Sequence, residues 1–219
     1  MKSKKYLIIL LPIFIIILFA TPVFAFTGTV QYSTNEFTNP YLNTSNYFSD
    51  VYDYVTGLGY SSQNLYNGSC SDIENAMENK AIFIWSGHGN PGEMVTSDVD
   101  SFNIYAQNST YNLSHDLPSG SLTNEIVWFQ GCSQADTDPS YGNLLDAVTS
   151  KSSGYTTAIG VDGPYNMSEG YTWNDLTWKY AYNQNSSITD VIYQAANDTG
   201  AGSIDLDPLN SSMVVEYYI

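Results

Sequence analysis

Two short hydrophobic runs dominate the pattern of apolar and polar positions along this chain. Residues 81–85 and residues 125–129 are rich in isoleucine, valine, phenylalanine and tryptophan, and a glycine follows two positions after each run. Runs of this length are too short for a buried helix, and they fit strands whose two faces are both covered. They therefore predict two central strands of an α/β sheet.

The rest of the chain alternates between helix and strand signals with short connections. Helices are expected where apolar residues recur at helical spacing or where a serine precedes acidic residues. The predicted helices are residues 46–58, 71–78, 141–149, 169–182 and 188–196. Further predicted elements are strands at residues 27–32, 61–66, 155–161 and 213–218, a small hairpin at 93–108, and a short turn or helix at 113–117. This order predicts one three-layer α/β/α domain with a mostly parallel central sheet and no internal repeat.

The first 25 residues have the pattern of a secretory signal. Residues 1–5 contain three lysines, residues 6–19 are almost wholly apolar, and small residues follow, so cleavage is expected after Ala25. The apolar stretch is long for a signal, and an uncleaved N-terminal membrane anchor is the alternative. Either reading predicts a secreted or cell-envelope protein whose folded domain is residues 26–219, with membrane contact only through an uncleaved N-terminal segment.

Composition narrows the choice of partners. The chain has a formal net charge of −16 and no arginine, and cleavage after Ala25 would remove three lysines and bring the charge to −19. Nucleic acid is therefore not an expected partner, because the surface lacks the cations that displace phosphate counterions. An exported chain with many N-x-[ST] sequons is expected to carry glycan at some of them. The sequons begin at Asn43, Asn67, Asn108, Asn112, Asn166, Asn185, Asn197 and Asn210.

A histidine and a cysteine follow the two central runs. His88 stands between two glycines in residues 86–89, and Cys132 ends the segment 130–132. The carboxyl ends of parallel strands meet at one edge of a sheet, so the two side chains are expected to meet there. A cysteine thiolate is a soft nucleophile, and a histidine base can take the proton of the thiol. We therefore expect acyl transfer through a thioester, with Cys132 as nucleophile and His88 as general base.

Residues 82–89, Ile-Phe-Ile-Trp-Ser-Gly-His-Gly, and residues 126–132, Ile-Val-Trp-Phe-Gln-Gly-Cys, resemble the caspase-like superfamily of cysteine peptidases, which includes caspases, metacaspases, legumain, gingipains and clostripain. His88 precedes Cys132 by 44 residues, and in caspases the separation is about 50. The α/β-hydrolases differ, because their histidine comes last, after a G-x-S-x-G elbow. The resemblance implies a caspase-like fold, endopeptidase activity on peptide or protein substrates, and an oxyanion hole built from the backbone amides of Gly89 and Cys132.

The resemblance also implies a first specificity pocket, to which the residue two positions before the nucleophile contributes. Here that residue is Gln130, as in the caspase sequence Gln-Ala-Cys. Caspases hold a substrate aspartate with arginines, and this chain has none. Asp136 and Asp162 are expected instead to attract a basic side chain, although both also fit ordinary turn chemistry. The predicted preference before the cut is lysine, arginine or a small neutral residue.

Plainer interpretations stay open for the same residues. Exported proteins meet oxidising conditions, so Cys132 is alternatively inert or bridged to Cys70, the only other cysteine. The chain would then be a non-catalytic cell-envelope binding module on the same fold. No zinc-ligand spacing and no cofactor motif is recognisable, and the carboxylate pairs that suit calcium complete no binding loop. Those pairs are Asp98 with Asp100, Asp136 with Asp138, and Asp205 with Asp207. The oligomeric state stays open.

Overall fold

The computed structural model describes residues 28–34, 47–96, 103–106, 115–116, 122–154, 156–164, 167–199 and 212–218. None of the helices in these ranges combines the length and the apolar character needed to cross a membrane. Several predictions concern segments outside the described residues: the signal or anchor at 1–25, the carboxylate pairs at 98 and 100 and at 205 and 207, and the sequons at 43, 108, 112, 166 and 210.

A six-stranded sheet forms the centre of the molecule. Its strands are β1 (Thr29–Thr34), β2 (Ser61–Tyr66), β3 (Ile82–Ser86), β8 (Ile126–Gln130), β9 (Thr156–Asp162) and β10 (Ser212–Tyr218). They lie in the order β10-β9-β8-β3-β1-β2. Within this sheet β1, β2, β3, β8 and β9 pair in parallel, and β10 joins β9 in antiparallel orientation at one edge. The predicted mostly parallel sheet is confirmed.

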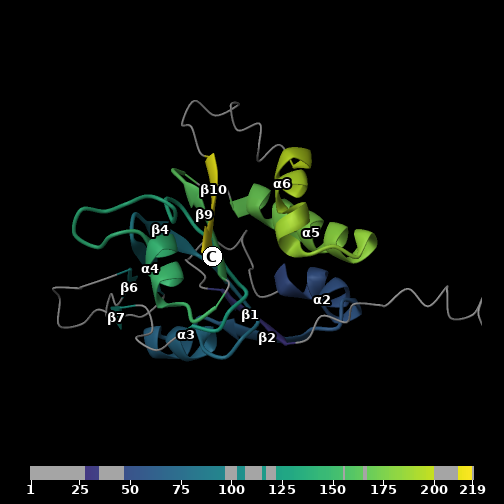
Figure 1. Ribbon diagram of the computed structural model, residues 1–219, viewed down its shortest axis with the longest axis horizontal. Helices are drawn as coiled ribbons and strands as arrows, with labels where there is room; N and C mark the ends of the chain where they lie inside the picture. Colours follow the sequence, from purple (N-terminus) through teal and green to yellow (C-terminus); the bar gives the residue numbers. More distant parts are fainter. Residues whose placement is uncertain are drawn as a thin grey trace, which may run out of the picture.

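Helices cover both faces of this sheet, which confirms the predicted three layers (Figure 1). One face carries α2 (Tyr47–Gly57), α5 (Met167–Gln184) and α6 (Ile188–Asp198), and the other carries α3 (Cys70–Met77) and α4 (Leu144–Lys151). Every residue of β3 and β8 is buried, because alternate side chains enter the two cores. Ile84 and Trp128 belong to the core under the three helices, whereas Trp85 and Phe129 belong to the core under the two.

Capping residues determine where the helices begin. The Ser69 hydroxyl accepts a hydrogen bond from the Asp72 amide and the Asp72 side chain accepts from Ser69, which closes a capping box at the start of α3. α6 begins with the same arrangement. The prediction of a helix over residues 141–149 is wrong at its start. α4 begins at Leu144, because the Asn143 side chain accepts from the amides of the first turn.

A second, smaller sheet follows β3 along the chain. Its strands, β4 (His88–Asn90), β5 (Glu93–Val95), β6 (Asn103–Tyr105) and β7 (His115–Asp116), are hydrogen-bonded in that order. β5 and β6 pair in antiparallel orientation, as the predicted hairpin at 93–108 requires. The prediction of a turn or helix at 113–117 is wrong at residues 115–116, the part of it that the structure describes, since β7 pairs in parallel with β6. Strands of two or three residues are too short to produce a periodic pattern in the sequence.

Candidate active site

The carboxyl ends of the two central strands lead to the predicted base and nucleophile. β3 and β8 pair in parallel with a constant offset of 44 residues, and the last pair is Ser86 with Gln130. The Gly87 amide extends this ladder by donating to the Gln130 carbonyl oxygen over 3.2 Å. The offset between His88 and Cys132 is the same 44 residues. The two residues therefore leave the sheet from equivalent positions on neighbouring strands.

His88 is the first residue of β4, opposite Val95 of β5. Its side chain is exposed to solvent. The preceding Gly87 is buried against the Trp85 indole, because a Cβ added to Gly87 would lie 2.6 Å from that ring. Trp85 is itself fully buried. The histidine thus follows directly on a rigidly packed segment of the core.

Cys132 lies in the turn directly after β8 and is half-buried. The other cysteine, Cys70, begins α3 and is 1% exposed, and its Sγ lies 3.5 Å from the hydroxyl oxygen of Thr96. Neither sulfur belongs to a disulfide. The structure therefore contains no bridge between the two cysteines.

The segments that carry His88 and Cys132 approach each other closely at two glycines. A Cβ added to Gly89 would lie 2.7 Å from the Cys132 carbonyl oxygen, and a Cβ added to Gly131 would lie 2.8 Å from the Gly87 carbonyl oxygen. Only glycine permits backbones to approach this closely. The two residues that the resemblance assigns to the oxyanion hole, Gly89 and Cys132, thus lie close together.

One residue that the sequence did not single out lies between these segments. Gln134 is fully buried, and its Nε2 donates to the carbonyl oxygens of Glu93, Asn90 and Cys132 over 2.7, 3.3 and 3.4 Å. A glutamine two positions after a cysteine, in a loop without periodicity, carries no sequence signal for such contacts. They exist only once the second sheet has packed against the loop.

Gln130 lies below the surface. It is 0% exposed, and its Oε1 accepts a hydrogen bond from the Tyr32 hydroxyl over 3.1 Å. Tyr32 belongs to β1, so this contact crosses the intervening strand β3. In this structure the side chain is part of the core rather than of an open pocket. Any effect of Gln130 on substrate selection would therefore act through the shape of the strand end.

Asp136 and Asp162 are brought together beside the Cys132 turn. The Asp162 side chain hydrogen-bonds the Asp136 carboxylate, and the Gly163 amide donates to Asp136 Oδ2 over 3.3 Å. Burial raises the pKa of Asp136, but hydrogen bonds from Asp162, Ser133 and the Gly163 amide outweigh it, so the pKa lies below its usual value. The Ser133 amide also donates to the Gly163 carbonyl oxygen over 2.7 Å. The acidic pair is therefore fastened to the turn that carries the thiol.

Metal binding finds no support among the described residues, which contain no group of three or more histidine, cysteine, aspartate or glutamate side chains placed to hold an ion. Of the carboxylate pairs that suit calcium, only residues 136 and 138 are described. Asp138 Oδ1 accepts from the amides of Ser140 and Tyr141 over 2.6 and 3.0 Å. Asp138 thus stabilises a turn.

No protein-family model matches this chain, and no curated protein matches it. Among solved structures, the crystal structure of the Drosophila initiator caspase Dronc is similar to it. The similarity covers 86% of this chain and 78% of the caspase chain, with a TM-score of 0.48 and 10% sequence identity. It concerns the course of the backbone and gives no residue a role.

Proposed function

We propose that the chain is an exported caspase-like cysteine endopeptidase in which His88 is the general base and Cys132 the nucleophile. The observation that carries this proposal is the shared register of β3 and β8, continued by the contact between Gly89 and the Cys132 carbonyl oxygen. Half-buried Cys132 and exposed His88 follow neighbouring strands at the edge where parallel sheets place their chemistry. Residues 26–219 would form the mature domain.

In the proposed reaction, His88 takes the proton of the Cys132 thiol. The thiolate sulfur then forms a bond to the carbonyl carbon of the scissile peptide. The amides of Gly89 and Cys132 would donate to the resulting oxyanion, and each such donor would stabilise the transition state by about 3 kcal/mol. The bond from carbon to nitrogen breaks as the imidazolium returns its proton to the leaving amine. Water, deprotonated by His88, finally hydrolyses the thioester and releases the acid and the thiol.

Specificity for a basic or small neutral residue before the cut belongs to the same proposal. The Asp136 carboxylate, hydrogen-bonded to Asp162, places negative charge beside the Cys132 turn, and no arginine in the chain could hold an acidic substrate side chain. Opposite charge attracts a substrate and raises its rate of association. A lysine or arginine before the scissile bond is therefore the expected best substrate, and an aspartate the worst.

Export and glycosylation complete the proposal. The asparagines of the three described sequons, Asn67, Asn185 and Asn197, are exposed, as a glycan acceptor on a folded domain must be. The signal at residues 1–25 would bring them to a compartment where glycan is added. Mass spectrometry of the natively secreted protein, before and after enzymatic removal of glycan, tests this part.

A peptide panel tests the proposed function. Fluorogenic peptides that differ only in the residue before the bond, lysine, arginine, alanine or aspartate, are incubated with the protein and with three variants. We expect cleavage after lysine or arginine to be abolished in Cys132→Ala, lowered by a factor of about 10² to 10⁴ in His88→Ala, and retained in Cys70→Ala. Cleavage fastest after aspartate would refute the specificity, and equal turnover by Cys132→Ala would refute the mechanism.

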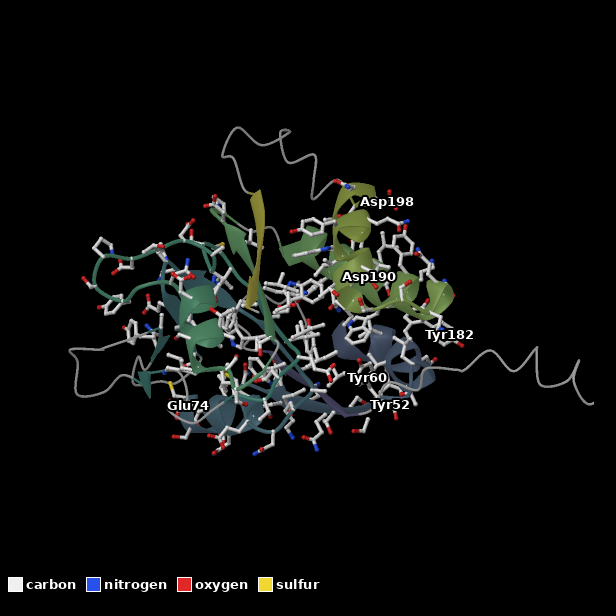
Figure 2. All side chains as sticks on the ribbon, in the orientation of Figure 1. Tyr52, Tyr60, Glu74, Tyr182, Asp190 and Asp198 are labelled. Atoms are coloured by element: carbon white, nitrogen blue, oxygen red, sulfur yellow. The ribbon has the colours of Figure 1, made fainter. Side chains whose placement is uncertain are left out.

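A non-catalytic binding module is the second candidate function. The exposed large hydrophobic side chains of the described residues are all tyrosines, namely Tyr52, Tyr66, Tyr182 and Tyr193. Figure 2 shows Tyr52 on α2 and Tyr182 on α5 at the surface. Exposed tyrosines suit recognition of a partner or a glycan. Binding to cell-envelope glycan that is unchanged in Cys132→Ala, with no peptide cleaved by the wild type, would favour this function.

A further inference from the structure

The main sheet alone does not fix the position of His88 relative to Cys132. Its ladder ends at Ser86 and Gln130, with one further hydrogen bond from the Gly87 amide. Beyond this point β4 enters the second sheet, while Cys132 enters a turn. The two side chains therefore belong to segments that diverge, and their separation must be fixed by contacts outside the main ladder.

Gln134 makes such contacts from the middle of the site. Its Nε2 donates to the carbonyl oxygens of Asn90 and Glu93, at the tip of the hairpin that begins with His88, and lies 3.4 Å from the carbonyl oxygen of Cys132 in its own loop. The 2.7 Å contact with Glu93 is a strong hydrogen bond by its length, and the other two are longer. One amide group thus joins the hairpin to the turn.

The surroundings of Gln134 are built around its side chain. It is 0% exposed. A Cβ on Gly89 would lie 2.6 Å from Cδ of Gln134, and a Cβ on Gly131 would lie 3.3 Å from its Cγ. The glycine after the base and the glycine before the nucleophile therefore leave the space that this glutamine fills. Any larger residue at Gly89 would displace it.

The amide has only one workable orientation. Its nitrogen faces three carbonyl oxygens, and a reversed amide would turn oxygen toward oxygen. In the described part of the chain its Oε1 is buried without a hydrogen-bond partner. An unpaired buried oxygen is unfavourable, but an apolar side chain of the same shape would leave the Glu93 carbonyl oxygen without its 2.7 Å donor. The amide nitrogen is therefore the group through which this side chain joins the hairpin to the turn.

We propose that Gln134 is a positioning residue that holds the His88 hairpin against the Cys132 turn, an inference that rests on the proposed peptidase function. Methionine matches glutamine in length and lacks the N–H groups, so Gln134→Met removes the tie and keeps the shape. In Gln134→Glu a carboxylate faces three carbonyl oxygens. Protonation in acid restores one O–H donor. Gln194, which is exposed on α6, supplies the matched control Gln194→Met.

Hydrogen exchange and kinetics on the full chain test this role together. In Gln134→Met we expect faster amide exchange over residues 88–95 and unchanged exchange over Ile188–Asp198. We also expect kcat lowered about 10²-fold, the loss that a misplacement of about 1 Å causes, with KM unchanged. Compared with the wild type at the same pH, Gln134→Glu should exchange faster at neutral pH and at a nearly equal rate in acid, which keeps the test decisive if the methionine variant folds poorly. Gln194→Met should match the wild type in every measurement.

Suppose that the wild type is active and that Gln134→Met folds. The inference is then overturned if amide exchange over residues 88–95 is unchanged in the variant, or if its kcat is unchanged. Failure of the proposed function is recognised separately. In that case the wild type cleaves no peptide, and the pH profile of Cys132 alkylation is the same in the wild type and in His88→Ala. In that case exchange alone decides whether Gln134 ties the hairpin to the turn: faster exchange over 88–95 supports the tie, and unchanged exchange overturns it.

Discussion

Replacement of Gly89 by alanine tests how closely the hairpin and the turn are packed. The added Cβ would lie 2.7 Å from the Cys132 carbonyl oxygen and 2.6 Å from Cδ of Gln134. Gly89 is outside the left-handed region of backbone conformation, so alanine would introduce no strain through φ. The whole effect should come from crowding at this contact.

The expected loss of stability follows from two contributions. Forcing a carbon into a packed site costs about 1–3 kcal/mol. Displacement of Gln134 also breaks its 2.7 Å hydrogen bond to the Glu93 carbonyl oxygen, which adds about 1 kcal/mol. The total is about 2–4 kcal/mol. In a domain of this size a loss near 3 kcal/mol lowers Tm by about 6–12 °C.

Urea unfolding followed by tryptophan fluorescence measures this loss, with Gly154→Ala as the matched control. A Cβ added to Gly154 meets nothing within 4 Å, so the control should stay within about 0.5 kcal/mol of the wild type. If Gly89→Ala were as stable as Gly154→Ala, the two segments would not be in contact, and the geometry inferred for the site would be wrong.

Three further predictions concern the surroundings of the site and the helix caps. Tyr32→Phe removes the hydroxyl that donates to buried Gln130, and thermal unfolding should show a loss of about 1–3 kcal/mol. Ser69→Ala removes the cap of α3 and should cost about 1 kcal/mol at pH 7. Hydrogen bonds from Ser69 lower the pKa of Asp72. The stability that they contribute is therefore present above the pKa that Asp72 has in the unfolded chain, and it is lost as the pH falls through the pKa that Asp72 has in the folded protein. Unfolding of Ser69→Ala at pH 7 and pH 2 should show that difference. The pKa of Asp136 is also lowered in the folded protein, so Asp136→Asn should destabilise the protein at pH 7 and less at pH 2. A larger loss of stability in acid would contradict the lowered pKa.

The central sheet was predictable because its strands carry their own signal. Residues 82–86 and 126–130 are buried on both faces, so they appear as continuous apolar runs that stop at glycine. The helices were predictable to within a few residues, since serine and asparagine caps act locally. The start of α4 was missed because Tyr141 lies three and four positions before Leu144 and Leu145, which extends the helical spacing past the Asn143 cap.

The sequence singled out the two reactive side chains of the site, but the contacts around them could not be predicted. His88 and Cys132 have a signal because each follows a strand and a glycine. Gln134 has none, since its partners come from a sheet of two-residue and three-residue strands that pairing alone creates. The burial of Gln130 was equally hidden, because it depends on Tyr32 from a strand 98 residues away.

The central claim is that His88 activates Cys132 as a nucleophile, and covalent labelling measures this most directly. The protein is incubated with an electrophilic peptide that ends in lysine, and the adduct is located by mass spectrometry. We predict a single adduct on Cys132, none on Cys70, no adduct in Cys132→Ala, and a rate at least about 10²-fold lower in His88→Ala. An intact Cys132 after prolonged incubation, or equal labelling rates with and without the imidazole, would contradict the claim.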